Sequence, residues 1–442
     1  MSARSTSRFF SGEALVLALA GAKLILHLLT ANRYGIFRDE LYYLACGEHL
    51  DWGYVDQPPL IALVAWMARH LFGDWLVGLR FFPALAGAAT VWLSGKLARE
   101  MGGGTFAQVL AALAVVCVPI YLVMHHWLTM NAFEPLVWIA CVWCIVRAIN
   151  RDDPRYWIWF GVFTGLGMQT KYGIAFFVDQ VQIMNPILFP LWLGGLVWLF
   201  LGREGRRFRV LGIVYIVLLA AFIALRGKNY YLASIYPVLF AAGAIGFEKI
   251  TAARWKWSRL VYALLVVGST IILAPTVSPI LSPEQFVAYQ KKLGFEPPKA
   301  ENQPTGPLPQ YFADEFGWEN IARETARVYN SLSPEEQART AIFANNYGEA
   351  GAIDYFGPRL GLPKSICNHQ SYWLWGPRDY DGSIVIVLGS DGTGDREHFQ
   401  SVEPAGRVEH PYSRRDEHFD IFLCRGLTGD LHQFWPRMKN YH

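Results

Sequence analysis

The sequence predicts a polytopic α-helical membrane protein that ends in a soluble α/β domain. The chain of 442 residues is 53% hydrophobic, and only 17% of its residues are charged, whereas a soluble protein has about a quarter. The shortage of charge is concentrated in the first 280 or so residues, which consist largely of apolar runs. The remaining residues have the composition of an ordinary soluble domain.

About nine apolar runs reach the length of about 20 residues that a helix needs to cross the hydrocarbon core of a bilayer. The first run has no small-residue cleavage site before Asn32, so we expect it to stay in place as a span. The predicted spans cover approximately residues 13–31, 79–98, 105–124, 131–149, 155–177, 183–201, 208–226, 231–248 and 258–276.

Lys and Arg residues predict how these spans are oriented. If the spans alternate in direction, four positively charged connections and the N-terminus fall on one side, which is then the cytoplasmic side. We therefore expect a transmembrane domain at 1–276 with a first external loop at 32–78, and a C-terminal tail that is also outside. The charges are Arg4, Arg8, Lys96, Arg99, Arg147, Arg151, Arg155, Arg203, Arg206, Arg207, Arg209, Lys249, Arg254, Lys256 and Arg259.

The external loop contains two apolar stretches, Leu41 to His49 and Leu60 to Phe72, that read as short amphipathic helices lying in the membrane interface. The tail begins with a proline-rich connector at 277–310 and continues as a predicted α/β domain at 311–442. There we expect a helix at Trp318–Asn330 and strands at Thr340–Ala344, Ser383–Leu388 and His418–Cys424.

The tail also holds two cysteines, Cys367 and Cys424. In an oxidising compartment they could form a disulfide, and free thiols are the open alternative.

Asp39 and Glu40 directly follow the first predicted span. Carboxylates at the mouth of a membrane protein are costly to desolvate, which makes them candidates for chemistry. The alternative is a helix start, where acidic residues favour the first turn. This alternative does not explain why Asp56 adds a third carboxylate to the same loop.

Cations also occur on the predicted outer side, at Lys171, Arg226 and Lys228. Together with the outer carboxylates they suggest a phosphate site. Ordinary anchoring of Lys and Tyr at the interface is the alternative, since a lysine at the end of a span can extend to water.

His125 and His126 form a further polar group with Asn131 and Glu134, in an outer loop followed by a helix. Adjacent histidines could bind a divalent metal together with Asp39 or Asp56. Polar residues at the interface are the alternative, so the sequence establishes no cofactor and leaves a metal open.

In their order along the chain, these residues resemble the GT-C glycosyltransferases. The most similar group is the bacterial family 39 of membrane glycosyltransferases, related to protein O-mannosyltransferases and to the aminoarabinose transferase of lipid A. The resemblance covers the whole membrane region. The segments that carry it are Arg38-Asp39-Glu40, Asp56-Gln57-Pro58-Pro59-Leu60, Thr170-Lys171-Tyr172-Gly173, Gly227-Lys228-Asn229-Tyr230-Tyr231 and Tyr236-Pro237.

The resemblance implies a glycosyltransferase of the bacterial inner membrane with a GT-C-like fold and a periplasmic C-terminal domain. In that family a polyprenyl-phosphate sugar is the donor, and a hexosyl or pentosyl group passes to an acceptor hydroxyl, usually with inversion. The acceptor is a protein, a lipid or a polysaccharide. Asp39 maps to the base, with Glu40 beside it. The implied substrate-binding residues are Asp56, Gln57, Asn131, Glu134, Lys171, Tyr172, Arg226, Lys228, Tyr230 and Tyr231.

The chain departs from this family at three places. Gln57 stands where the aminoarabinose branch commonly has Lys, and Asn131 stands where several relatives have a second acidic residue. The segment Phe177–Val181 joins two predicted spans almost directly, whereas relatives usually have two or more extra spans there. A naturally short chain and an internal deletion that removes part of the lipid groove are both open.

A transporter and a non-catalytic glycan-binding protein are the alternative classes of function. A lipid or sugar transporter would have charged residues deep within its spans, whereas few such residues exist here and most charges cluster at the ends of the spans. A non-catalytic glycan-binding protein would not need Lys171 and Lys228 on the outer face. No basic tract is long enough to suggest binding of nucleic acid. The sequence does not specify the sugar or the acceptor.

Overall fold

The structure is a computed structural model that describes residues 12–151, 153–167, 181, 183–224, 229–294 and 306–441. Contacts divide the chain into two compact units. The helical unit comprises Met1–Asn32 and Phe72–Ile280, and the α/β unit comprises Arg33–Leu71 and Leu281–His442. Most of the predicted external loop is thus grouped with the C-terminal residues, although the two are far apart in the sequence.

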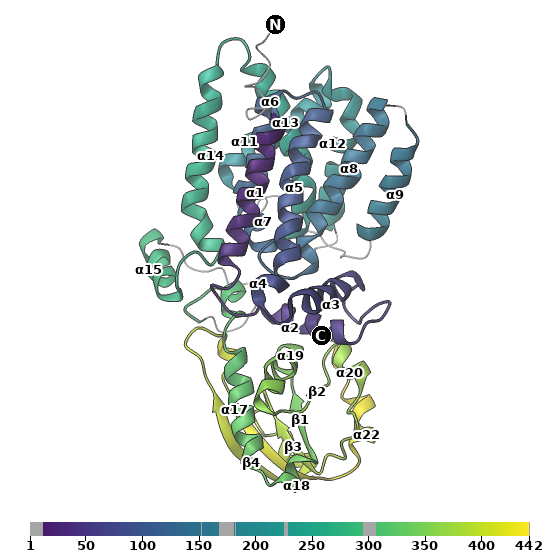
Figure 1. Cartoon of the computed structure of the whole chain (residues 1–442), viewed down its shortest axis with the longest axis vertical. Helices are drawn as coiled ribbons and strands as arrows, with labels where there is room; N and C mark the ends of the chain where they lie inside the picture. The colour runs from purple at the N-terminus through teal and green to yellow at the C-terminus, as the bar shows by residue number, and fades with distance from the viewer. Residues whose placement is uncertain are drawn as a thin grey trace. The chain divides into compact units, whose positions relative to one another are not determined.

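The helical unit is built from long apolar helices that run side by side (Figure 1). Its centre is α13, which is buried along most of its length, whereas α14 exposes a row of leucine and isoleucine side chains. The helices are α1 Gly12–Thr30, α4 Leu76–Leu79, α5 Phe81–Glu100, α6 Thr105–Cys117, α7 Pro119–Met124, α8 Glu134–Arg151, α9 Arg155–Gly167, α11 Phe189–Leu201, α12 Arg209–Ala224, α13 Tyr236–Ile250 and α14 Lys256–Val277.

Glycines allow α11 and α13 to cross closely. A Cβ added at Gly195 of α11 would collide with the carbonyl oxygen of Leu239, and one added at Gly243 of α13 would collide with that of Leu191. Small residues that bring two backbones together are typical of helices packed in a membrane, where hydrophobicity does not drive association.

Four helices among the described residues are long and apolar enough to cross a membrane: Gly12–Thr30, Met130–Arg151, Tyr230–Ile250 and Lys256–Val277. A fifth candidate is the pair Pro186–Leu201 and Gly205–Ala221, which bends by 97° at a short break. The prediction of about nine spans stays a prediction.

The α/β unit contains a sheet of five strands in the order β2-β1-β3-β5-β4, counting the strands that the structure describes. β1 runs parallel to β2 and β3, and β5 runs antiparallel to β3 and β4. The predicted strands at Thr340–Ala344, Ser383–Leu388 and His418–Cys424 are confirmed by β1, β3 and β5. The strands are β1 Thr340–Ala344, β2 Ile366–Cys367, β3 Ile384–Val387, β4 Phe399–Val408 and β5 Phe419–Leu427.

Helices complete the α/β unit. The predicted helix at Trp318–Asn330 is confirmed by α17, which packs against β4 and against α19. The predicted amphipathic stretches also form helices, α2 and α3, and α2 begins three residues earlier than expected. The helices are α2 Arg38–Glu48, α3 Leu60–Phe72, α15 Pro283–Leu293, α16 Gln310–Ala313, α17 Trp318–Asn330, α18 Pro334–Gln337, α19 Tyr347–Phe356, α20 Ser371–Trp375, α21 Asp395–His398 and α22 Leu431–Phe434.

The sheet register rules out the disulfide that the sequence left open. Cys367 lies in β2 opposite Ala344, and Cys424 lies in β5 opposite Val385. Their strands are three positions apart in the sheet, which corresponds to about 14 Å at about 4.8 Å per strand. A disulfide needs Cα atoms within about 7 Å, so the disulfide alternative was wrong, and both cysteines are free and buried.

Candidate functional site

Asp39 and Glu40 lie in the first turn of α2, and the structure gives them different surroundings. Glu40 is 1% exposed, and its Oε2 accepts a hydrogen bond of 2.8 Å from the backbone N–H of Phe37, the residue that precedes the helix. Side chains that turn back to an N-terminal N–H satisfy donors that the helix itself leaves unpaired. The helix-start interpretation therefore accounts for Glu40.

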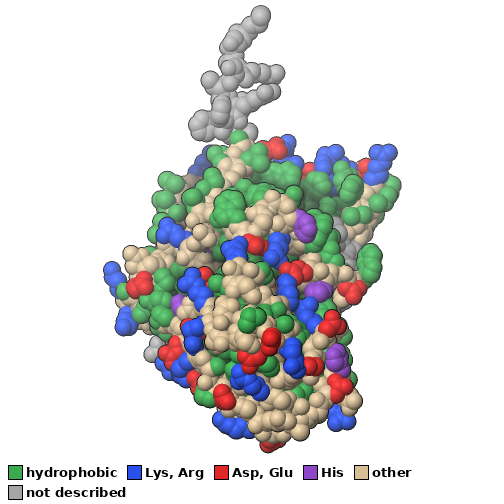
Figure 2. Space-filling model, turned by 60° about the horizontal axis from the view of Figure 1, so that its bottom comes forward, with side chains coloured by type: hydrophobic (Ala, Val, Ile, Leu, Met, Phe, Trp, Pro, Cys, Tyr) green, Lys and Arg blue, Asp and Glu red, His purple; other side chains and the backbone are tan. Residues whose placement is uncertain are grey.

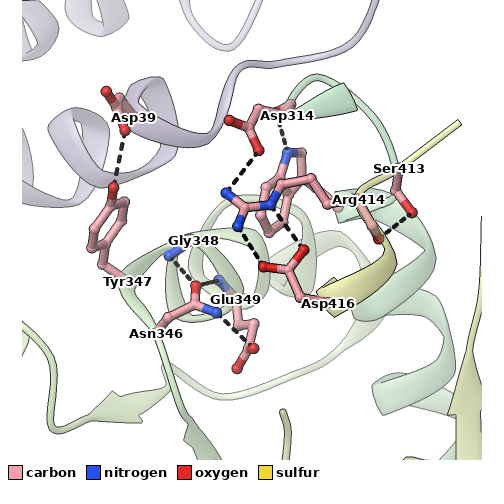
Figure 3. A network of polar contacts seen from close by, with 10 residues as sticks. Asp39, Asp314, Asn346, Tyr347, Gly348, Glu349, Ser413, Arg414 and Asp416 are labelled. Carbon is pink, nitrogen blue, oxygen red and sulfur yellow. Dashed lines mark hydrogen bonds and ion pairs between the residues drawn. The ribbon is translucent and has the colours of Figure 1, made fainter. Parts of the chain in front are cut away.

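Asp39, by contrast, is half-buried and contacts the C-terminal part of the α/β unit. Its Oδ1 accepts a hydrogen bond of 3.1 Å from the hydroxyl of Tyr347, the first residue of α19 (Figure 3). Arg38 lies over the ring of Tyr347, with 4.8 Å between the guanidinium carbon and the ring centroid. A base candidate, a tyrosine and a cation thus form one contact group.

Local sequence explains why α19 starts at this point. Oδ1 of Asn346 accepts hydrogen bonds from the backbone N–H groups of Gly348 at 2.8 Å and Glu349 at 3.0 Å, which caps the helix (Figure 3). The helix then packs against α2 through two glycines. A Cβ added at Gly348 would lie 2.9 Å from Cγ of Arg38, and one added at Gly351 would lie 2.7 Å from Cβ of Leu41.

Buried acids and one arginine surround this contact group. The backbone carbonyl of Asp314 accepts from the N–H of Arg38 at 3.0 Å, and its carboxylate lies 3.5 Å from Arg414. Burial raises the pKa of Asp314 to about 7, although Arg414 and Arg38 act in the opposite direction. Arg414 also pairs with Asp416, to which its Nε donates at 2.9 Å (Figure 3).

Two further carboxyl groups, Glu349 and Glu417, are buried in the same region. Burial raises the pKa of both, and each is raised further by a neighbouring carboxylate, whereas the charge of Arg38 lowers it. Glu349 is held by the N–H of Asn345 at 2.8 Å and by the side-chain amide of Asn346 at 2.7 Å. Burial thus favours the protonated form of these acids, and the charge of Arg38 opposes it.

Asp56 belongs to the same unit. The hydroxyl of Tyr42 donates to Oδ1 of Asp56 at 2.8 Å and lies 2.8 Å from Oγ of Ser371. The ring of Tyr42 packs on that of Tyr347, with 4.8 Å between the centroids, so Asp56 and Asp39 are linked through two tyrosines. Gln57 is buried and directs its amide toward Sγ of Cys46 at 3.5 Å.

The helical unit holds the polar group of Asn131 and Glu134, in a 3-10 turn at Met130–Ala132 and at the first residue of α8. The side chains of His125 and His126 are buried nearby. His126 Nε2 lies 3.1 Å from an arginine nitrogen of Arg80, an environment that disfavours a cation. No group of three His, Cys, Asp or Glu side chains that could hold a metal occurs in the part of the chain that the structure describes.

The remaining site residues predicted from the sequence divide between described and undescribed positions. Tyr230 and Tyr231 lie in the 3-10 segment Asn229–Ile235, where their rings meet edge to face at 4.6 Å. Outside the described residues are Lys171, Tyr172, Arg226, Lys228 and most of the junction 177–181.

Sequence reasoning missed Tyr347 and Asp314 as neighbours of the pair Asp39-Glu40. By its sequence alone, the stretch Asn345–Asp354, which holds amides and a tyrosine, is compatible both with contact with carbohydrate and with a role in the domain core. The structure uses it as a capped helix that packs on α2. No local sequence pattern could indicate that this helix would contact α2.

Comparison with known proteins gives a family match for part of the chain. Residues 56–223 match the family described as dolichyl-phosphate-mannose-protein mannosyltransferase. A curated relative, the polyprenol-phosphate-mannose–protein mannosyltransferase of Corynebacterium glutamicum, is 25% identical over 32% of this chain and 32% of its own length. The match thus spans about a third of the relative.

Solved structures extend the likeness to almost the whole chain. ArnT from Cupriavidus metallidurans in the apo state has a TM-score of 0.52 and 12% identity, and covers 92% of this chain and 97% of its own. The same protein bound to undecaprenyl phosphate has a TM-score of 0.51 with the same coverage. At this identity the likeness shows the fold. Together with the partial family match it bears out the resemblance seen in the sequence: the chain has an ArnT-like fold and is similar to membrane glycosyltransferases with the GT-C fold.

Proposed function

We propose that this protein transfers a sugar from a polyprenyl-phosphate donor to an acceptor hydroxyl on the periplasmic side, with inversion, and that Asp39 is the base. The observation that carries the proposal is the unequal environment of the two adjacent carboxylates. Glu40 is buried as a helix cap, whereas Asp39 is half-buried and held at one oxygen by Tyr347. Asp39 is therefore the carboxylate that an acceptor can approach.

The chemistry needs little beyond this carboxylate. As the acceptor oxygen attacks C1 of the sugar, its proton passes to Asp39 and the bond from C1 to the phosphate oxygen breaks. The electron pair of that bond leaves with the polyprenyl phosphate, so a general acid is not required where cations stabilise the departing charge. Lys171, Arg226 and Lys228 are proposed for that role.

The donor class is supported by what the similar proteins are called. The curated relative is named for polyprenol-phosphate mannose, and one ArnT structure is described as bound to undecaprenyl phosphate. We propose the same class of lipid carrier here. Asp56 and Gln57 are proposed to line the sugar or acceptor side, with Tyr172, Tyr230, Tyr231, Asn131 and Glu134 completing substrate binding.

A lipid or sugar transporter is the second candidate, and one observation favours it. Lys23 lies in the middle of α1, is fully buried, and donates to the carbonyl of Tyr121 at 3.3 Å. Ionisable groups within a span often mark the path of a substrate. A transporter would move the lipid-linked sugar without breaking the bond to phosphate.

Release of free polyprenyl phosphate separates the two candidates. Proteoliposomes with the full-length protein would be supplied with radiolabelled polyprenyl-phosphate mannose or polyprenyl-phosphate aminoarabinose and a membrane extract as acceptor. We expect the wild type to release polyprenyl phosphate and Asp39→Ala to release none while remaining folded. Near-normal release by Asp39→Ala would remove the role of Asp39, and movement of intact donor without release would favour the transporter.

A further inference from the structure

We infer that Tyr347 positions the carboxylate of Asp39, so that the C-terminal region supplies part of the catalytic apparatus. The inference rests on the proposed function and deepens it. Its first support is geometric: the hydroxyl of Tyr347 donates to Oδ1 of Asp39 at 3.1 Å (Figure 3). This hydrogen bond joins the second residue of α2 to the first residue of α19.

The ring of Tyr347 is held from several sides, which makes its hydroxyl a fixed donor. Arg38 lies over it at 4.8 Å, the ring of Tyr42 packs at 4.8 Å, and the ring of His369 lies at 5.0 Å. The backbone N–H of Tyr347 also lies 3.4 Å from Nδ1 of His369. A donor that does not reorganise holds its acceptor in one orientation at no cost during the reaction.

Fixing Oδ1 of Asp39 also fixes the direction of Oδ2. The terminal torsion of an aspartate is broad, so a free carboxylate samples many orientations. With Oδ1 bound to Tyr347, Oδ2 is left to take the acceptor proton. Loss of the donor would leave the base present but misoriented, and a misplacement of about 1 Å can cost about 100-fold in rate.

Inhibition by Tyr347 is the opposite interpretation of the same hydrogen bond. A tyrosine hydroxyl that donates to Asp39 imitates the acceptor hydroxyl, and it would then inhibit the enzyme by occupying the acceptor position. Removal of the hydroxyl lowers kcat if Tyr347 positions the base, and raises kcat if Tyr347 blocks it.

Tyr347→Phe tests the inference, and the chain offers a matched control. Tyr372 is also buried in the α/β unit, and its hydroxyl donates to Oδ2 of Asp354 at the same distance of 3.1 Å. Tyr372→Phe therefore removes an equivalent tyrosine–carboxylate hydrogen bond that is made to Asp354 and not to Asp39. Steady-state release of polyprenyl phosphate and thermal unfolding would be measured for the full-length wild type and both variants.

We expect Tyr347→Phe to lower kcat by about 10- to 100-fold with little change in the KM for the donor. Tyr372→Phe should lower the unfolding temperature by a similar amount and keep its kcat within about twofold of the wild type. Equal losses of kcat in the two variants, a raised kcat, or an unchanged kcat in Tyr347→Phe would each overturn the inference.

The activity of Asp39→Ala distinguishes failure of the proposed function from failure of the positioning role of Tyr347. If Asp39→Ala is inactive and Tyr347→Phe is fully active, the proposed base stands and the positioning role of Tyr347 falls. If Asp39→Ala is active, or the wild type releases no polyprenyl phosphate, the proposed function falls and the inference falls with it. Loss in Asp39→Ala with a selective fall of kcat in Tyr347→Phe supports both.

Discussion

Gly351 of α19 faces Leu41 of α2 so closely that an added Cβ would lie 2.7 Å from Cβ of Leu41 and 3.1 Å from its carbonyl carbon. Helices whose backbones approach this closely cannot accept even a methyl group without moving apart. This crossing holds the first turn of α2, with Asp39, against the first turn of α19, with Tyr347.

Gly351→Ala is therefore expected to lower the free energy of unfolding of the α/β unit by about 1–3 kcal/mol, since it overpacks the crossing. Transfer activity should fall together with stability because the added methyl displaces Asp39 from Tyr347. Gly394→Ala is the control, since nothing lies within 4 Å of a Cβ added there. Unfolding followed by circular dichroism would measure both, and equal stability of the two variants would contradict the tight crossing.

Glu40→Ala is expected to act mainly on stability. It removes the acceptor of the Phe37 N–H, and loss of such a cap costs about 1 kcal/mol. Glu336 makes the same kind of contact at the start of α18, where its Oε2 accepts from Ser333 N–H at 3.1 Å. Glu336→Ala is thus a cap variant in a different helix, which also removes an ion pair of 3.1 Å with Arg425.

Chemical denaturation should give similar losses for the two cap variants. Glu40→Ala should retain more transfer activity than Asp39→Ala. Complete loss of transfer in a stably folded Glu40→Ala protein would instead assign Glu40 a direct part in the reaction.

Asp314 predicts a pH dependence of stability. Burial raises its pKa from 3.8 to about 7, against the opposing charges of Arg414 and Arg38. The folded state therefore binds the proton more tightly than the unfolded state does. The stabilisation is complete below about pH 4 and is lost as the pH rises through about 7.

Asp314→Asn should weaken this dependence, because the amide is neutral at every pH. The unfolding temperature of the wild type should fall between about pH 5 and about pH 8 by more than that of the variant. Asp381→Asn is a control of opposite sign, since hydrogen bonds from Ser383 lower the pKa of Asp381 and its effect appears in acid. An equal or larger fall in the Asp314→Asn variant would contradict this assignment.

Gly195 and Gly194 give a paired prediction for the helical unit. An added Cβ at Gly195 would collide with the backbone of α13, whereas nothing lies within 4 Å of one at Gly194. Gly195→Ala should therefore separate α11 from α13 and lower the unfolding temperature in detergent. Gly194→Ala should be neutral or slightly stabilising, since alanine favours a helix over glycine by about 1 kcal/mol. The same loss in both variants would count against close packing at this crossing.

The parts of the fold that could be predicted from the sequence are those with a local pattern. The periodicity of Trp318–Asn330 defines α17, and the apolar run Ser383–Leu388 contains β3. β2 has only two residues, and β4 is an edge strand that includes Glu403, Pro404 and Gly406, so neither has an apolar signal. An edge strand tolerates such residues because one side of its backbone needs no partner strand.

In the candidate site, too, only the features with a local sequence pattern could be predicted. Asp39 was identified from its place after the first span, and Glu40 could be explained as a helix start. The partner of Asp39 could not be predicted, because Tyr347 is 308 residues away in the sequence. Surface charge carried little information, since Lys, Arg, Asp and Glu side chains are interspersed on the face shown in Figure 2.

The separation of 308 residues between Asp39 and Tyr347 also has a consequence for biosynthesis. α2 leaves the ribosome well before its packing partner α19 is made. At about 5–20 residues per second the interval is tens of seconds. A nascent chain would therefore hold the helices made between α2 and α19 before Tyr347 is available to orient Asp39, so the proposed transfer would begin only after α19 has folded against α2.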